Sequence, residues 1–142
     1  MNSAFFVDSN IIMYAVGAEH AYRSPCLDAL ERIIRESLQA VVSSEVHQEI
    51  LHRYLSIGLP DKAREVSIKL ETIIPATLPV TLADIRRVRL LSERYPALKA
   101  RDLIHAAVML ENGVTRILST DRHFDRLAEI ERIDPHGFCR GT

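Results

Sequence analysis

The 142-residue sequence contains only two cysteines, Cys26 and Cys139, which lie far apart. They form neither the closely spaced pairs of a zinc site nor a redox motif. Disulfide frameworks belong to oxidising compartments, so two isolated cysteines favour a reducing one. We therefore predict a cytoplasmic protein.

Long apolar segments and an excess of one charge are also missing. No stretch reaches the roughly 20 apolar residues that cross a bilayer. The apolar run at residues 5–7 is too short for a secretory signal. The 18 Lys and Arg residues nearly balance the 19 Asp and Glu residues, so there is no global basic field for tight nucleic-acid binding. A nuclease is still compatible with this balance, because local cations and a bound metal can supply the positive charge.

What is present is enough for one domain with a real core, since nearly half of the residues are hydrophobic. Strands are predicted at residues 5–7, 40–42, 76–80, 116–119 and 130–133. Helices are predicted at residues 9–16, from 24 onward, and at 45–56, 61–74, 82–95, 97–112 and 124–128. This alternation predicts a three-layer α/β/α domain over residues 1–142, with helices on both faces of a central parallel sheet.

Three local features refine this prediction. Ser24 is expected to cap the second helix, with Pro25 in its first position. Pro79 places its strand at a sheet edge or a strand end. The second helix carries apolar residues at helical spacing, namely Leu27, Leu30, Ile34 and Leu38.

Two acidic residues directly follow predicted strands. Asp8 ends the run at residues 5–7, and Asp121 ends residues 117–121 (ILSTD). Taken singly, an Asp in such a position is more often a cap or turn residue than a ligand. The pattern occurs twice, however, and the carboxyl ends of parallel strands share one edge of a sheet. We therefore expect the two carboxylates to meet there.

Two further acids lie in predicted helices. Glu49 is at the border of the apolar face formed by Val46 and Ile50, although most acidic residues on helices are solvated. Glu45, one turn earlier, is the alternative. An acid in the first turn also favours the helix dipole, so we prefer Glu49. Asp102 lies early in its helix, where the dipole is again a sufficient explanation.

The charge of these acids points to a metal ion. Converging carboxylates repel one another unless some of them take up protons. A hard divalent cation removes that repulsion, and Mg²⁺ prefers oxygen ligands, while no lysine in the pattern serves instead. Zinc is disfavoured, because His47 and His52 are not one turn apart and no cysteine pair accompanies them. His105, about one turn after Asp102, can either reach the site or pack as a satisfied core histidine, and we expect the second.

The four acids lie within four short segments. These are residues 6–12 (FVDSNII), 43–51 (SSEVHQEIL), 101–107 (RDLIHAA) and 118–124 (LSTDRHF). Together they resemble the PIN domain family, and in particular the VapC-type toxins of bacterial and archaeal toxin–antitoxin pairs. The segments occur in the family's order and cover almost the whole chain, which makes the combination far more specific than any one of them.

The resemblance implies a metal-dependent endoribonuclease. Asp8, Asp102 and Asp121 match the acids that hold the metal, and Glu49 matches the fourth catalytic acid. The resemblance also implies supporting roles near these acids for Asn10, Ser119, Thr120 and Asp125. Many family members are homodimers, and toxin members are inhibited by a cognate antitoxin peptide laid into the active-site groove.

We infer a mechanism in which one or two Mg²⁺ or Mn²⁺ ions activate water for in-line attack on RNA, leaving a 3′-hydroxyl and a 5′-phosphate. Residues that can contact the RNA backbone are Arg101, Arg122, His123 and Arg126, although solvated surface cations are an equally good explanation for each singly. Two alternatives remain. A receiver-like domain would need an acid at the end of a middle strand and a lysine near the last. A binding-only PIN-like module would tolerate loss of an acid, and none is lost here.

Overall fold

Parallel strands form the centre of the fold, in a computed structural model that describes residues 4–139. Within those residues five strands lie in the order β3-β2-β1-β4-β5, and every neighbouring pair is parallel. The chain therefore builds outward from β1 in one direction and then in the other. The strands are β1 (Phe5–Val7), β2 (Ala40–Ser43), β3 (Thr77–Leu78), β4 (Arg116–Leu118) and β5 (Glu131–Ile133).

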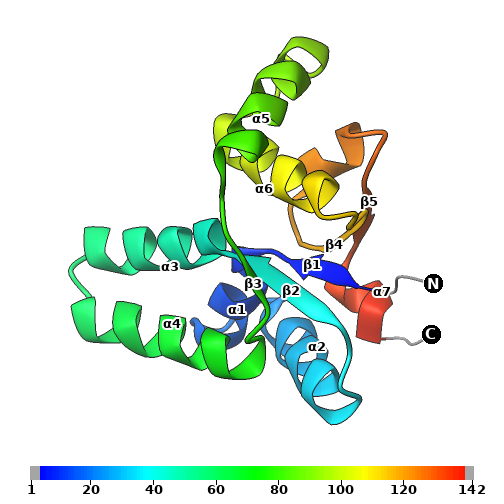
Figure 1. The fold of residues 1–142 in the computed structure, drawn as a ribbon. Coiled ribbons are helices and arrows are strands. Elements are labelled where there is room, and N and C mark those ends of the chain that lie inside the picture. The colour runs from blue at the N-terminus through cyan, green and yellow to red at the C-terminus, as the bar shows by residue number, and fades with distance from the viewer. Residues whose placement is uncertain (1–3, 140–142) are drawn as a thin grey trace.

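Helices cover both faces of this sheet. Figure 1 shows α5 and α6 on one side, and α1, α2 and α4 on the other. The α-helices are α1 (Ser9–Val16), α2 (Arg23–Arg35), α3 (Ser44–Ser56), α4 (Pro60–Ile73), α5 (Leu82–Arg94), α6 (Ala100–Glu111) and α7 (Pro135–Cys139). A 3₁₀-helix, η1 (Arg122–Arg126), follows β4. The predicted three-layer α/β/α fold with a central parallel sheet is therefore confirmed.

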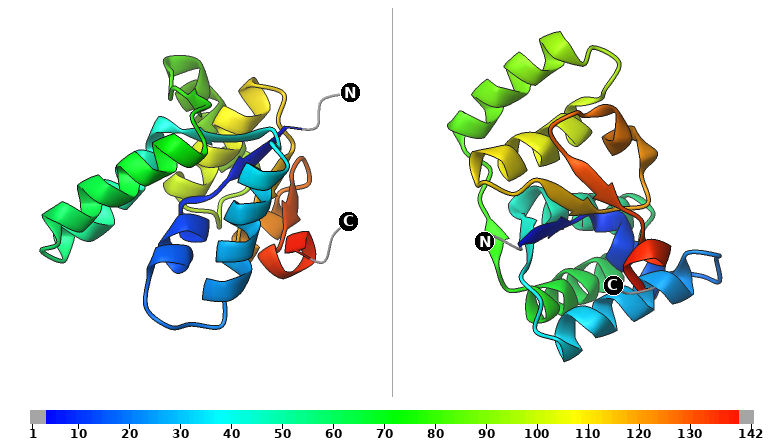
Figure 2. Two further views of the ribbon diagram at one scale, coloured as in Figure 1. Left: turned by 90° about the horizontal axis from the view of Figure 1, so that it is seen from below. Right: turned by 90° about the vertical axis from the view of Figure 1, so that its right-hand side faces the viewer.

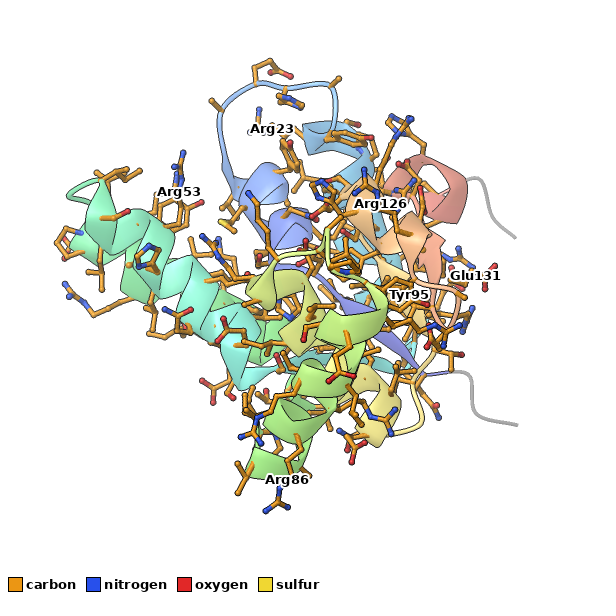
Figure 3. The ribbon with its side chains drawn as sticks, turned by 90° about the horizontal axis from the view of Figure 1, so that it is seen from above. Arg23, Arg53, Arg86, Tyr95, Arg126 and Glu131 are labelled. Atoms are coloured by element: carbon orange, nitrogen blue, oxygen red, sulfur yellow. The ribbon has the colours of Figure 1, made fainter. Side chains whose placement is uncertain are left out.

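The helical hairpin of α3 and α4 extends from the body as an arm, which the left view of Figure 2 shows most clearly. Ser43 begins α3, since its hydroxyl accepts a hydrogen bond from the Val46 N–H. The inner side of α3 carries Val46 and Ile50, which are buried as the sequence predicts, together with the buried Tyr54. Figure 3 shows Arg53 on this arm and Arg86 projecting from α5, away from the sheet.

The central strands of the sheet are buried. All three residues of β1 are buried, and Ile117 and Leu118 of β4 have no exposed surface. A parallel sheet covered on both faces requires such continuous apolar strands. The position predicted for Pro79, at a sheet edge or a strand end, is also confirmed, because Pro79 directly follows β3 and β3 pairs with β2 alone.

The second helix differs from its prediction at its start and on its buried face. It begins at Arg23 after Tyr22, and no side chain caps it, so the cap predicted at Ser24 is wrong. Leu27 and Ile34 are exposed by 37% and 57%. Apolar residues line two faces of this helix, and the predicted set mixed them, since Leu30 is buried as predicted whereas Leu27 and Ile34 are not. The residues that pack inward are Cys26, Ala29, Leu30 and Ile33.

The sixth helix begins at Ala100, three residues later than predicted. The segment after Pro96 first forms a turn, in which the Leu98 N–H donates to the Tyr95 carbonyl. Lys99 then precedes the helix in an extended conformation. The apolar spacing through Ala97 is therefore continued by a loop, not by another helical turn. The short α7 carried no signal that we recognised in the sequence.

Within the described part of the chain, no helix is long and apolar enough to cross a membrane. The single domain predicted for residues 1–142 remains a prediction. Residues 1–3 and 140–142 lie outside the described residues.

Adjacent isoleucines on α2 offer a direct test of its buried face. Ile33 is 3% exposed and Ile34 is 57% exposed. We expect Ile33→Ala to lower the free energy of unfolding by about 2–4 kcal/mol, because it removes packed methyl groups from the core. Ile34→Ala should change it by less than about 0.5 kcal/mol. Urea unfolding followed by circular dichroism measures both, and equal losses would contradict the observed orientation of α2.

Candidate active site

The pairing of β1 with β4 brings the first and last acidic segments together. Val7 is opposite Leu118 in the register, and the Asp8 N–H donates to the Leu118 carbonyl at 3.0 Å. Asp8 and Ser119 therefore leave the sheet side by side at its carboxyl edge. The strand order reverses at this point, which is where open α/β sheets bind ligands.

Asp8 is fixed by three donors. Its Oδ1 accepts from the Ser9 backbone N–H at 2.8 Å, which caps α1. Its Oδ2 accepts from the Ser119 hydroxyl at 2.7 Å and from Asn10 Nδ2 at 3.1 Å. The carboxylate is 6% exposed, so its orientation is set by the protein and not by solvent.

The loop after β4 is tied to the same network. The Ser119 hydroxyl accepts from the Asp121 N–H at 2.9 Å, and the Thr120 N–H donates to Asn10 Oδ1 at 3.3 Å. Asp121 in turn accepts from the His123 N–H, and His123 Nδ1 lies 2.8 Å from Asp121 Oδ1. These contacts place the Asp121 carboxylate on the same side of the sheet as Asp8.

Two helices bring the remaining acids. Asp102, in the first turn of α6, has its Oδ2 3.9 Å from His123 Nδ1. Glu49 reaches in from α3, and its Oε1 lies 2.8 Å from His105 Nε2. The same nitrogen is 3.8 Å from Asp8 Oδ1. Glu49 lies at the border of the apolar face of α3 and is buried. The alternative acid, Glu45, is half-buried and lies outside the cavity that the four acids share.

All four acids face one open cavity of about 300 Å³. Potential ligand atoms fall into two groups, each spanning no more than 4.8 Å. One group is Asp8, Glu49 and His105, and the other is Asp102, Asp121 and His123. Basic side chains complete the lining, which consists of Asp8, Ser9, Asn10, Glu49, Lys99, Arg101, Asp102, His105, Asp121 and His123.

Crowding shifts the pKa values in this cavity. Burial raises the pKa of Asp8 above its ordinary value, while His105 opposes the shift. Burial also raises the pKa of Asp102, and the charge of Asp121 adds to the effect. Burial alone would raise the pKa of Glu49, but the hydrogen bond and charge of His105 hold it below its usual value. Two of the acids therefore retain protons more readily than in water, as expected for carboxylates that share a pocket.

Most of the residues singled out in the sequence are gathered here, including Asn10, Arg101 and His123. Asp125 is not. Its carboxylate binds the Arg132 guanidinium at 2.9 and 3.3 Å. Asp125 follows Asp121 by four residues, about one turn of an α-helix, but η1 is a 3₁₀-helix with three residues per turn, so Asp125 faces another direction. Arg122 and Arg126 are exposed, and like Asp125 they do not line the cavity.

Three lining residues were missed or misjudged from sequence. Ser9 was not among the candidate site residues, yet it is buried and its side chain hydrogen-bonds Glu49. Lys99 lines the cavity although no lysine was expected near the acids. His105 is buried as predicted, but it also contacts Glu49, so the expectation that it would pack without reaching the site is wrong.

Comparison with known proteins agrees with this geometry. A family model described as the PIN domain matches residues 5–130. Ribonuclease VapC13 of Mycobacterium tuberculosis is 36% identical over 127 residues, which are 89% of this chain and 97% of the relative.

Solved structures share the fold at lower identity. VapBC2 from Rickettsia felis bound to a promoter DNA fragment has a TM-score of 0.73 and 12% identity, and the match covers 92% of this chain and 98% of that one. A toxin–antitoxin complex from Klebsiella pneumoniae has a TM-score of 0.65 and 15% identity, over 92% and 97% of the two chains. A family match across most of the sequence, joined to a relative above 30% identity over nearly its full length, shows that the chain belongs to the PIN domain family.

Proposed function

We propose that this protein is a metal-dependent endoribonuclease and the toxin of a type II toxin–antitoxin pair. The observation that carries the proposal is the convergence of Asp8, Glu49, Asp102 and Asp121 on one cavity from four separate segments. Membership of the family and the naming of the relative VapC13 as a ribonuclease support it. A binding-only PIN-like module is the alternative, and the complete acidic set does not favour it.

The donors of the cavity fit a divalent cation. They are mainly carboxylate oxygens, which Mg²⁺ and Mn²⁺ both accept. Burial raises the pKa of Asp8 and of Asp102, and neighbouring acids add to both shifts, so a bound cation would favour the ionised form of these carboxyls. Asp8, Asp102 and Asp121 would hold the ion, with Glu49 binding it directly or through water. When bound, the ion would polarise the scissile phosphate and lower the pKa of a water molecule.

The protein's own groups position the reactants. Ser119, Asn10 and the Ser9 N–H hold the Asp8 carboxylate in one orientation. Thr120 contributes through its backbone N–H, which fixes the Asn10 side chain. We assign RNA phosphate contacts to Lys99, Arg101 and His123 on the cavity wall, and to the exposed Arg122, which does not line the cavity. Asp125 would act on the site only through Arg132.

Attack by water accounts better for this cavity than attack by the RNA 2′-hydroxyl. The 2′-hydroxyl route needs an acid and a base that are free to exchange protons. Within the described residues, His105 of the cavity is buried and cannot reach an RNA hydroxyl, whereas four carboxylates line the cavity and suit a metal-activated water. The products expected from water attack carry a 3′-hydroxyl and a 5′-phosphate.

A second hollow supports the antitoxin as a partner. A cavity of about 460 Å³ lies between α1 and the α3–α4 arm, and it shares Asn10 with the acidic cavity. Ile57 and Leu59 on its wall are exposed by 49% and 44%, and Arg53 and Lys62 add positive charge. We propose that an apolar antitoxin segment with an acidic end binds there and reaches the site past Asn10.

A pair of aspartates four residues apart tests the assignment of the acids. Asp121 lies in the cavity, whereas Asp125 binds Arg132 outside it. We expect Asp121→Asn to reduce Mn²⁺-dependent RNA cleavage by more than about 100-fold, since even groups that support metal ligands contribute 10–100-fold. Asp125→Asn should retain most of the activity. Gel assays on labelled RNA measure both, with end-group analysis of the products. Cleavage that persists in EDTA would refute the metal requirement.

The raised pKa of Asp102 predicts a pH-dependent gain in stability on its neutralisation. The folded state holds the Asp102 proton more tightly than the unfolded state does, so this carboxyl costs stability as the pH rises above its ordinary value of 3.8. We therefore expect Asp102→Asn, in EDTA, to raise the melting temperature at pH 7 by roughly 2 °C and to have no such effect near pH 4. Thermal melts at both pH values provide the measurement. A variant less stable than the wild type at pH 7 would contradict the assigned direction.

We also propose a homodimer formed through the third to fifth helices. Two leucines of α5 are largely exposed to solvent, Leu82 by 57% and Leu90 by 68%. Light scattering after gel filtration should give twice the chain mass, and Leu90→Glu should shift the protein to monomer, because a charge at an apolar contact is costly to bury. A wild-type monomer at micromolar concentration would exclude this dimer.

A further inference from the structure

A buried imidazole joins three of the acid-bearing segments. His105 on α6 is 1% exposed, and its Nε2 lies 2.8 Å from Glu49 Oε1 on α3. The same Nε2 is 3.8 Å from Asp8 Oδ1 at the end of β1. His105 follows Asp102 by three residues, so both side chains lie on neighbouring parts of one helical face.

The ring is held by its apolar neighbours. Phe6 packs against it with a centroid separation of 5.3 Å, and Phe124 lies at 6.5 Å. Its Nδ1 is buried and has no hydrogen-bond partner within residues 4–139. Burying an unpartnered polar atom is unfavourable, and an apolar side chain of similar size would avoid that cost. Packing therefore does not explain a histidine here, whereas the contact of Nε2 with Glu49 does.

Glu49 needs such a partner more than the other acids do. Asp8 and Asp121 follow strands, and their short side chains are fixed by backbone N–H groups at 2.8 Å from Ser9 and 2.9 Å from His123. Glu49 comes from the α3–α4 arm on a longer side chain with more rotatable bonds. Its carboxylate is held by His105 and by the side chain of Ser9, the residue next to Asp8. Both partners draw Glu49 toward the Asp8 end of the cavity.

We propose that His105 is a positioning residue, which donates from Nε2 to Glu49 and holds that carboxylate in place to serve the bound cation. The proposal rests on the proposed function, since it presupposes that the cavity binds a divalent metal. His105 itself does not contact the RNA. Histidine–carboxylate contacts behind metal ligands commonly contribute 10–100-fold to metal affinity.

Two substitutions of His105 separate the hydrogen bond from the volume of the ring. His105→Leu fills much of the space without a donor. His105→Gln restores an amide N–H near the position of Nε2. Using the full chain and Mn²⁺ alone as the probe, isothermal titration calorimetry should show about 10- to 100-fold weaker binding for His105→Leu. Binding by His105→Gln should be largely restored. A Mn²⁺ affinity of His105→Leu equal to that of the wild type would overturn the proposal.

A matched control comes from another histidine on a helix. His47 lies on α3 at 2.8 Å from the Ser67 hydroxyl, outside the acidic cavity. His47→Leu should leave Mn²⁺ affinity unchanged, and melts in EDTA should show that both leucine variants are folded. Equal loss of affinity in His47→Leu and His105→Leu would show a general structural effect and overturn the proposal.

Coupling to Glu49 is the second readout. If His105 acts through Glu49, then His105→Leu should weaken Mn²⁺ binding no further in a Glu49→Gln background. An undiminished additional loss in that background would overturn the proposal, because His105 would then act independently of Glu49. Absence of Mn²⁺ binding by the wild-type protein is a different outcome, since it would refute the proposed function itself.

Discussion

The parallel pairing of β1 with β4 is the constraint on which the site depends. Because Val7 is paired with Leu118, Asp8 lies beside Ser119 at the carboxyl edge of the sheet. A hydrogen bond of 2.7 Å joins the side chains of Asp8 and Ser119. Shifting a strand by one residue turns its side chains to the opposite face. Such a slip would separate Asp8 from Ser119 and would also disrupt the packing of the β1 side chains against the helices on both faces. The apolar core therefore fixes the geometry of the acidic cavity.

The sequence was sufficient where one local rule governs the outcome. Asp8 and Asp121 follow apolar strands, and parallel strands place their carboxyl ends together, so their convergence was predictable. Glu49 was predictable as well, because it borders the buried face of α3. The start of α6 was not, since the apolar spacing continues through a loop. The direction of Asp125 was also beyond local reasoning, because it depends on η1 being a 3₁₀-helix and not an α-helix.

His105 shows where local reasoning ends. A histidine on an apolar helix face is consistent with simple packing, and its spacing does not reveal a partner 56 residues away. The contact with Glu49 depends on how α3 and α6 approach each other across the end of β1, which is a tertiary property. The same applies to Lys99, which enters the cavity wall because α6 begins later than its apolar pattern indicates.

The Asp8 carboxylate has two roles, because it faces the cavity and also caps the N-terminus of α1. Loss of a capping side chain costs about 0.5–2 kcal/mol whatever happens to catalysis. Selection for folding alone could thus preserve an aspartate at this position in a descendant that no longer cuts RNA. Asp102 caps no helix within residues 4–139, and its place in the first turn of α6 gives it only the weaker interaction with the helix dipole. In a survey of homologous genes, the residue at position 102 would distinguish working enzymes from decayed copies better than the first aspartate of the motif.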